Sequence, residues 1–438
     1  MKTLFSRRLC LLLFAFLPGI APLGAWTAVG ADVTLRPVPE NWEARTSLRE
    51  TIFAPVLDAA AAPRRLVTQT ESPVDVLFHT QIQDKALYMV FENRNGKRFP
   101  LAGAGTFIIK RSLHDGSFVQ AKVFIQNDPG CYLRLFPEPD DRTAMDIVLY
   151  NEEFQTHVVI PVPFRDLLTS PFTRIVDLSR SSVDWPLVMA PEQGPGDARL
   201  AGIVQTLRGR IKGLRDMDDG AMDASGKLVF IATGAPAPPR KGGFNCSGFA
   251  KWVIDGFYLP LTTTFTDINA LRSRDSDLLG KAWSARYEEE QDPYFGLDWS
   301  RGLARALEDA RTGVMPGPDA LDVTDADRVP HVKDVGYPVE RLPALLYFLS
   351  RNRPGTIYLG SVNARAKYAP PGSSMLLRQH HHVVVLLPHF DEEGDFHPVV
   401  MERNKETSVA SLVKRYGGEY VNLVRVDSTG QFAPPELH

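Results

Sequence analysis

The stretch GGFNCSGFAKWVIDGF, residues 242–257, decides the fold of the C-terminal half of the chain. Asn245 is a residue type that commonly caps helix N-termini, and the glycine pair before it lets the chain turn. Large apolar residues then recur at helical spacing and indicate one buried face: Phe249, Trp252, Val253 and Phe257. The pattern predicts a helix that begins at Cys246.

A cysteine in the first turn of a helix has unusual chemistry. Free backbone N–H groups and the positive end of the helix dipole favour the thiolate of Cys246, which is the reactive form. The same N–H groups can hold an oxyanion. Ser247 and Gly248 are small and would leave room for a substrate carbonyl, so they are predicted to line a substrate site. The alternative is that Cys246 is a small core residue, since cysteine is often buried.

A histidine run begins a second informative stretch, HHHVVVLLP at residues 380–388. The apolar residues occupy both parities, which is typical of a central strand with both faces covered. In a regular strand only His380 and His382 share a face. The run therefore does not predict a metal site, and no metal is expected. His382 is predicted to be a general base for Cys246; the alternative is a solvated strand start.

A second strand is predicted at residues 397–403, after the turn region 390–395. A hairpin would place this strand beside the histidine strand. Glu402 or Asn404 could then accept a hydrogen bond from the base and fix its tautomer. Glu402 is the first choice, because a carboxylate is unusual within an apolar run, and Asn404 stays open.

These motifs resemble the NlpC-type cysteine peptidases of bacterial cell walls. That family begins its catalytic helix with Asp-Cys-Ser-Gly and an apolar residue, and residues 246–249 read Cys-Ser-Gly-Phe after Asn245. Residues 353–359, RPGTIYL, resemble the Pro-Gly strand that precedes the family's histidine strand. The resemblance implies a papain-like α+β core without a cofactor. It also implies that Cys246 is the nucleophile, His382 the base and Glu402 its orienting partner.

Besides Asn245 in place of the family's Asp, the sequence departs from that family in several ways, and the family's substrate-contacting Tyr upstream of the cysteine has no clear match. Cys246 and His382 are 136 positions apart, which is longer than the family's usual spacing and implies an insertion at about residues 261–342. Such an insertion could cover the cleft as a lid. Glu402 stands where the family more often has His, Asn or Gln.

The N-terminal half of the chain has a different sequence pattern, one that is typical of β-strands. From residue 74 to 178, short runs rich in β-branched and aromatic residues alternate with turn residues, which favours a β-sandwich or barrel. A β-rich domain is therefore predicted at 32–190, followed by a linker at 190–197 and a helix at 198–214. The hydrolase-like domain would occupy 198–438. The fold class expected for the whole chain is α+β.

The first thirty residues resemble a secretory signal peptide: a basic start, an apolar run and small residues before a cleavage site after Gly30. An uncleaved anchor and a twin-arginine signal at Arg7-Arg8 are the alternatives. No later stretch predicts a membrane span. The mature chain is expected in the periplasm or outside the cell.

Composition limits the function further. The net charge of −3 gives no electrostatic case for nucleic-acid binding, and three cysteines (Cys10, Cys131 and Cys246) cannot form a disulfide scaffold. The leading hypothesis is a secreted cysteine hydrolase that cleaves a peptide or amide bond in the stem peptides of peptidoglycan. The alternatives are an envelope amidase or acyltransferase on the same scaffold, and a non-catalytic envelope binding protein.

Overall fold

The protein is described from a computed structural model, which covers residues 36–238, 243–272, 296–326, 328–333, 335–365 and 378–436. The predicted leader, with Cys10, lies outside these residues, and so do residues 273–295 of the predicted insertion. Within the described ranges, no helix is both long enough and apolar enough to cross a membrane.

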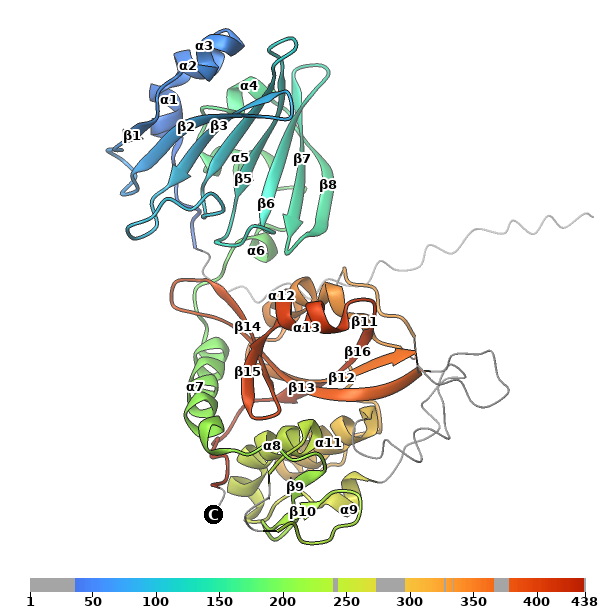
Figure 1. Ribbon diagram of the computed structural model, residues 1–438. Helices are drawn as coiled ribbons and strands as arrows, with labels where there is room; N and C mark the ends of the chain where they lie inside the picture. Colours follow the sequence, from blue (N-terminus) through green and yellow to red (C-terminus); the bar gives the residue numbers. More distant parts are fainter. Residues whose placement is uncertain are drawn as a thin grey trace, which may run out of the picture.

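The N-terminal domain contains one antiparallel sheet of eight strands, each paired with its neighbour in the chain (Figure 1). The first and last strands are edges, so the sheet is open. The prediction of a sandwich or barrel is therefore wrong in detail: helices, and not a second sheet, cover the buried face. The strands are β1 (Arg65–Val67), β2 (Val76–Gln83), β3 (Ala86–Asn93), β4 (Phe107–Ser112), β5 (Phe118–Phe124), β6 (Tyr132–Glu138), β7 (Arg142–Leu149) and β8 (Glu152–Ile160).

Short helices precede and follow this sheet. Ile52 and Leu167 are examples of their fully buried side chains, which join the core formed by one face of the sheet. Strands were predicted as far as residue 178, but residues beyond Ile160 form helices, because Phe172 and Ile175 repeat at helical spacing toward that core. The helices are α1 (Trp42–Ser47), α2 (Arg49–Phe53), α3 (Val56–Ala60), α4 (Phe164–Leu167), α5 (Phe172–Ser179) and α6 (Trp185–Val188).

The C-terminal domain is built on a six-stranded antiparallel sheet in the order β11-β16-β12-β13-β14-β15. The histidine strand, β13, is central, and residues 383–387 are at most 1% exposed, which confirms the predicted strand with two covered faces. The strands are β11 (Tyr337–Pro338), β12 (Thr356–Arg365), β13 (Arg378–Phe390), β14 (Phe396–Glu402), β15 (Lys405–Ser408) and β16 (Tyr420–Asp427). A separate small hairpin contains β9 (Gly220–Met222) and β10 (Leu228–Phe230).

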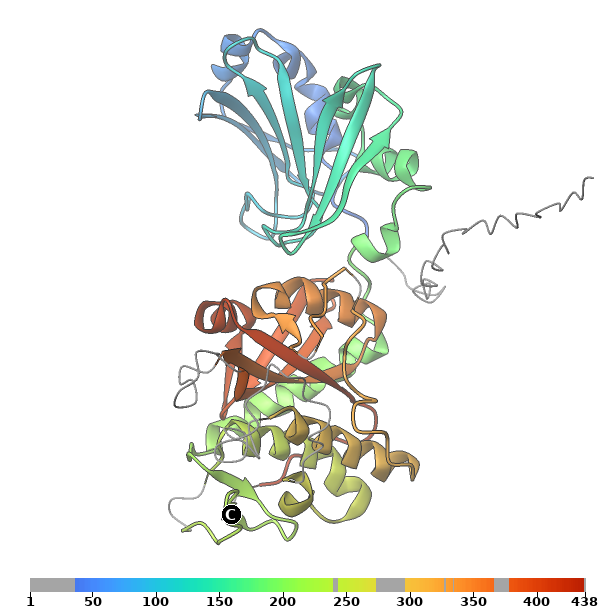
Figure 2. The same cartoon turned by 90° about the vertical axis from the view of Figure 1, so that its right-hand side faces the viewer.

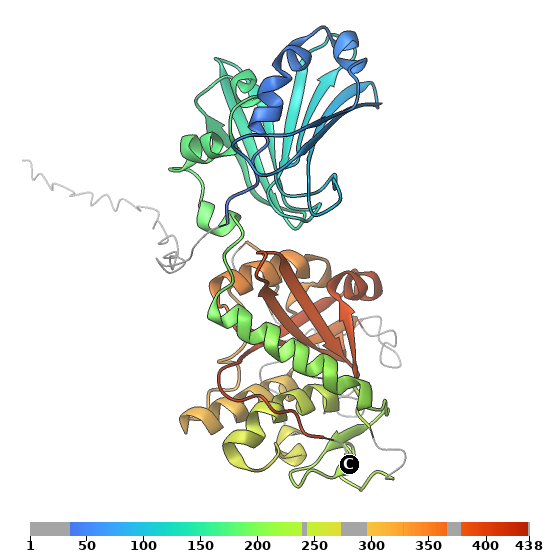
Figure 3. The same cartoon turned by 90° about the vertical axis from the view of Figure 1, so that its left-hand side faces the viewer.

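Helices cover both faces of this sheet (Figure 2). One layer contains α7 (Pro195–Arg210), α8 (Cys246–Thr262), α9 (Ile268–Leu271) and α11 (Leu297–Thr312). The other contains α12 (Leu342–Asn352) and α13 (Val409–Tyr416), and short 3-10 turns lie at Ile211–Gly213 and Val339–Arg341. Figure 3 shows α7 running from the junction of the two domains along the sheet. This helix begins inside the predicted linker, because Gly194 and Pro195 start it.

The two domains share one hydrophobic core. Tyr347 of α12 donates a hydrogen bond to Leu187 O (2.9 Å), accepts one from Gln126 Nε2 (3.1 Å) and packs on Tyr150 with ring centroids 5.0 Å apart. Phe154 and Phe348 stack beside it. The buried cluster on the α12 face of the C-terminal sheet is thus continuous with the core of the N-terminal domain.

The described part of the insertion belongs to the fold. Helix α11 packs against α8, β12 and β16, and its Trp299 and Leu303 are fully buried. Residues 321–323 run along the edge of β16, bonded through Arg425 N to Leu321 O (2.9 Å) and Val323 N to Leu423 O (2.9 Å). These residues form a structural layer of the domain and not a lid.

Candidate functional site

Helix α8 begins at Cys246, as the sequence predicts. Asn245 is the N-cap, and its Oδ1 accepts a hydrogen bond from the Gly248 backbone N–H at 2.7 Å. Cys246 is buried, with 4% of its surface exposed, and packs in the core between α8 and the sheet. Its position in the first turn leaves backbone N–H groups at the helix start, where they can interact with a thiolate or an oxyanion.

Backbone hydrogen bonds hold the segment before Cys246 against residues 215–220. Phe244 N–H donates to Arg215 O (3.0 Å), and Met217 N–H donates to Phe244 O (3.2 Å). Asn245 N–H donates to Gly220 O (3.2 Å). Because these bonds involve the backbone, they fix the position of the helix start without depending on side chains.

Ser247 and Gly248, the predicted substrate-lining residues, are both buried. Ser247 Oγ lies 4.0 Å from Cys246 Sγ, and Ser247 O accepts a hydrogen bond from the Trp299 indole at 3.1 Å. A Cβ atom on Gly248 would lie 1.8 Å from Gly220 O. Backbone packing against β9 therefore accounts for this glycine, and the structure gives it no open space for a substrate.

Replacing Gly248 with alanine is expected to destabilise the protein by about 1–3 kcal/mol, because the added methyl group overlaps a backbone oxygen held in a strand. Urea unfolding of the two proteins measures the difference. Gly202→Ala in α7 is the matched control, since a Cβ there meets nothing within 4 Å. That variant should gain about 0.5–1 kcal/mol from reduced backbone entropy. Equal stability of the two variants would contradict the packing role of Gly248.

His382 and Cys246 come together at the start of β13. The imidazole of His382 and the backbone N–H of Val383 are both close enough to the sulfur to lower the pKa of the Cys246 thiol. Strand β14 pairs with β13 only from Val385 to Phe390, so the edge of β13 at Val383 is not covered by β14. The sulfur of Cys246 therefore approaches β13 where its neighbouring strand has ended.

A bulge in β13 changes the predicted arrangement of the histidines. His382 pairs with Val362 and His380 with Asn363, so His381 is the extra residue. Because adjacent residues of β12 point to opposite faces, His380 and His382 lie on opposite faces of the sheet. The prediction that they share a face is wrong, since it assumed a regular strand.

Glu402, the last residue of β14, lies beside His382. Its Oε2 is 2.5 Å from His382 Nε2, which leaves Nδ1 of the ring for Cys246. Its Oε1 accepts hydrogen bonds from Thr407 Oγ1 (2.6 Å) and from the guanidinium of Arg415. Asn404, the alternative third residue, lies in the following turn and donates to Arg215 O (2.7 Å). The structure thus brings together Cys246, His382 and Glu402.

The three groups change one another's charge state. Burial raises the pKa of the Cys246 thiol, but the hydrogen bond and charge of His382 outweigh it, so this pKa lies below its ordinary value. Burial lowers the pKa of His382, but its interactions with Cys246 and Glu402 have the larger effect and raise this pKa to about 9. Burial opposes ionisation of Glu402, yet its hydrogen bonds lower its pKa to about 2. All three shifts favour a thiolate beside an imidazolium that is held by a carboxylate.

Helix α13 contributes two residues that the sequence analysis missed. Arg415 bonds to Glu402, and the Tyr416 ring packs on His382 with centroids 5.7 Å apart. Burial raises the pKa of Tyr416, and the charges of Glu402 and Cys246 act in the same direction. Ser408, a typical N-cap residue, is the sequence signal for this helix, but no local pattern shows that it packs over the histidine strand.

The structure also accounts for a buried lysine and for a second buried cysteine, both of which lie outside the candidate site. Lys251 of α8 is fully buried because its ammonium pairs with Asp255 at 2.6 Å, and Asp255 also accepts from Thr266. Cys131 is fully buried before β6 and accepts a hydrogen bond from the Tyr150 N–H at 3.3 Å. Burial raises the pKa of the Cys131 thiol, so it stays protonated, as a packing residue would.

Comparison with known protein families gives a match to part of the chain. A model of a domain of unknown function (DUF8515) matches residues 34–187, which correspond to the N-terminal domain. No curated protein and no solved structure matches the chain. The match ends before Cys246 and therefore does not include the candidate site. The geometry of the site defines an α+β protein with a helix-borne cysteine beside a His–Glu pair.

Proposed function

We propose that this protein is a cysteine hydrolase that cleaves a peptide or amide bond through a covalent acyl-enzyme. The observation that carries the proposal is the grouping of Cys246, His382 and Glu402: His382 Nε2 lies 2.5 Å from Glu402 Oε2, and the imidazole is close enough to Cys246 to lower the pKa of its thiol. A nucleophile in contact with a base, and a base oriented by a third group, is the arrangement that acyl transfer requires.

Each residue has a role in the proposed reaction. The Cys246 thiolate attacks the carbonyl carbon, and the oxyanion that forms accepts hydrogen bonds at the start of α8. The His382 imidazolium protonates the leaving amine as the carbon–nitrogen bond breaks, which leaves a thioester. His382 then takes a proton from water, the resulting hydroxide attacks the thioester, and Cys246 leaves as the thiolate. Glu402 stabilises the imidazolium throughout.

The substrate class is proposed from the resemblance to NlpC-type peptidases, whose papain-like core has the same order of cysteine helix, Pro-Gly strand and histidine strand. A six-stranded antiparallel sheet with the cysteine helix packed on it supports that assignment. We infer that the bond lies in a stem peptide of peptidoglycan and that the leader directs the protein to the periplasm or the cell exterior. No metal or cofactor takes part in the proposed reaction.

The test is incubation of the mature protein with purified cell-wall fragments and measurement of new amine ends. Wild type should release amines, Cys246→Ala should release none, and Cys131→Ala should match wild type, because Cys131 lies in the other domain. Release by Cys246→Ala equal to wild type would contradict the proposal. Intact fragments together with labelling of Cys246 by a thiol-reactive probe would favour the amidase or acyltransferase. Intact fragments without labelling would favour the binding protein.

A further inference from the structure

Glu402 is a buried carboxylate whose two oxygens have different partners. Only 1% of its side chain is exposed. Its Oε2 lies 2.5 Å from His382 Nε2, and its Oε1 accepts hydrogen bonds from Thr407 Oγ1 (2.6 Å) and from the guanidinium of Arg415. Of these three partners, only Arg415 keeps a positive charge at every stage of the proposed reaction, since a guanidinium stays protonated in proteins. Arg415 is therefore the permanent counter-ion of this carboxylate.

Helix α13 holds Arg415 in a defined position. Its Nε donates a hydrogen bond to Ser411 O, one helical turn earlier, at 3.3 Å. Its guanidinium lies over the ring of Tyr416, with the guanidinium carbon 4.9 Å from the ring centroid. Leu412, which is 1% exposed, anchors the helix in the core. The side chain of Arg415 is 38% exposed, so it reaches the buried carboxylate from the protein surface.

The location of the protons on His382 explains why the carboxylate needs this counter-ion. Because Nε2 faces Glu402, Nδ1 is the atom that exchanges protons with the leaving amine and with water. A buried carboxylate without a positive partner gains affinity for a proton. If Glu402 took the Nε2 proton from the imidazolium, the ring would become a neutral imidazole protonated at Nδ1. Such a ring is a poor acid for the amine and cannot accept a proton from water.

The charges of the site balance only when Arg415 is counted. In the resting state, the Cys246 thiolate and the Glu402 carboxylate offset the His382 imidazolium and Arg415. In the thioester state, Cys246 and His382 are uncharged, and Glu402 offsets Arg415. Without Arg415 the site would carry a net negative charge in both states, which is unfavourable in buried surroundings.

Other ionisable groups close to the pair have partners of their own or are neutral. His381, the neighbour of His382 on β13, pairs with Glu419 at 3.0 Å. Arg403, the residue after Glu402, pairs with Asp216 at 3.1 Å. The hydroxyl of Tyr416 is uncharged, because burial raises its pKa. Arg415 is thus the cation that directly contacts the carboxylate from α13.

We propose that Arg415 is a positioning residue of the candidate active site, which fixes the Glu402 carboxylate and supplies the positive charge that it needs when His382 is neutral. This inference rests on the proposed hydrolase function, because the neutral state of His382 arises during that reaction. Since Arg415 acts through Glu402, its loss should change the rate of the reaction and not the binding of the substrate.

The test is the pH dependence of Cys246 alkylation by iodoacetamide in the mature protein, which needs no substrate. Arg415→Gln removes a positive charge and so favours the protonated thiol. The midpoint of the alkylation profile should therefore move to higher pH by about 0.5 or more. Arg415→Lys keeps the charge and should restore the wild-type midpoint. In the amine-release assay, Arg415→Gln should lower kcat about tenfold or more and change KM little.

Two variants separate the specific contact from general effects. Lys414→Gln is the matched control, because it removes the same charge from the exposed neighbour of Arg415 on α13. It should keep the wild-type midpoint and kcat. Thr407→Val removes the uncharged donor from the same oxygen of Glu402, so it should move the midpoint less than Arg415→Gln does.

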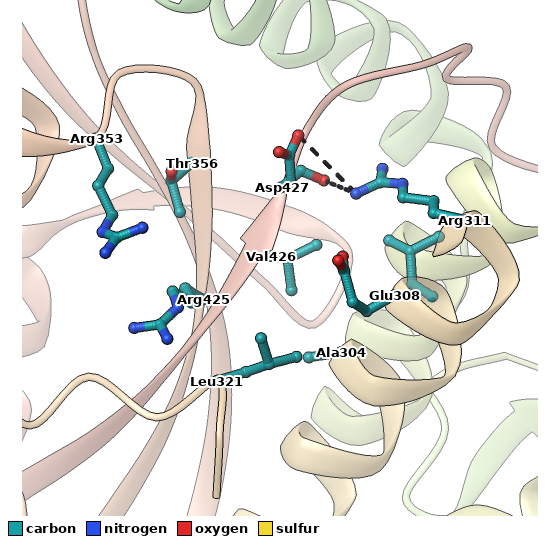
Figure 4. Close-up of a pocket in the computed structure, with 10 residues that line it drawn as sticks. Ala304, Glu308, Arg311, Leu321, Arg353, Thr356, Arg425, Val426 and Asp427 are labelled. Carbon is teal, nitrogen blue, oxygen red and sulfur yellow. Dashed lines mark hydrogen bonds and ion pairs between the residues drawn. The ribbon is translucent and has the colours of Figure 1, made fainter. Parts of the chain in front are cut away.

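Arg353→Gln is a distant control for the loss of an arginine. Figure 4 shows Arg353 beside Thr356, where β12 begins, and both residues line a pocket there. His382 pairs with Val362, further along the same strand. Arg353→Gln should therefore keep the wild-type alkylation profile and kcat.

The outcomes distinguish this proposal from the proposed function. A folded Arg415→Gln protein whose alkylation profile overlays the wild type would overturn the role of Arg415. An equal shift in Lys414→Gln or Thr407→Val, or no recovery in Arg415→Lys, would overturn it as well. Absence of amine release by the wild type would instead contradict the hydrolase, because the alkylation profile does not depend on a substrate. Circular dichroism of each variant shows whether the fold is retained.

Discussion

Replacing His382 with alanine is expected to lower hydrolysis by about 10²–10⁴-fold, the contribution of a positioned general acid–base group. The loss has two causes. The leaving amine has no proton donor, and Cys246 loses the partner that overcomes the effect of burial on its pKa. Without that partner the thiol stays protonated at neutral pH and becomes a poor nucleophile. The amine-release assay gives the first effect, and the rate of Cys246 alkylation by iodoacetamide gives the second.

His381→Ala is the matched control for this experiment. His381 is the next residue on the same strand, but it is partly exposed and pairs with Glu419 at 3.0 Å. Its loss should change hydrolysis and alkylation little. A folded His382→Ala protein that retains the wild-type rate of either reaction would show that another group activates Cys246.

The sequence was most informative where one helix or strand determines the structure by itself. The spacing of Phe249, Trp252 and Phe257 and the cap at Asn245 place the start of α8 at Cys246, which is what the structure shows. The apolar run after His382 likewise gives the central strand. These features depend on period and capping, which are local properties of a chain.

Features that depend on pairing between distant segments could not be predicted from such local sequence patterns. The bulge at His381 follows from the register between β12 and β13, and the contact of Arg415 with Glu402 depends on the packing of α13. The open sheet of the N-terminal domain is a third case, because strand spacing alone does not say whether a sheet closes. Each of these follows from tertiary contacts and not from a local pattern.

The sequence also left Glu402 and Asn404 open as the third residue of the site. Glu402 and Asn404 are two positions apart, so in a strand both side chains would point to the same face and either could reach the histidine. The structure separates them because β14 ends at Glu402, so Glu402 still faces His382 while Asn404 lies in the turn with a left-handed backbone (φ +70°). The end of a strand is one of the least predictable features of a sequence, so the choice needed the structure.

Replacing Glu402 with glutamine is expected to shift the alkaline limb of the hydrolysis pH profile toward neutral pH. In the wild type His382 has a pKa of about 9, so the imidazolium that protonates the leaving group is lost as the pH rises through about 9. Glu402 remains ionised down to about pH 2 and stabilises that imidazolium through its charge. Glutamine keeps the shape and a hydrogen-bonding oxygen but removes the charge. The pKa of His382 should then fall, and hydrolysis should decline at a lower pH.

The matched control is Asn404→Ala, which removes the other candidate for the third residue. Its side chain contacts Arg215 O and not His382, so its alkaline limb should stay at the wild-type position. Rates of amine release between about pH 6 and pH 10 measure both profiles, and urea unfolding at neutral pH identifies any loss of fold. A Glu402→Gln profile that overlays the wild type would show that the carboxylate does not set the charge state of His382. A shift in Asn404→Ala instead would assign that role to Asn404.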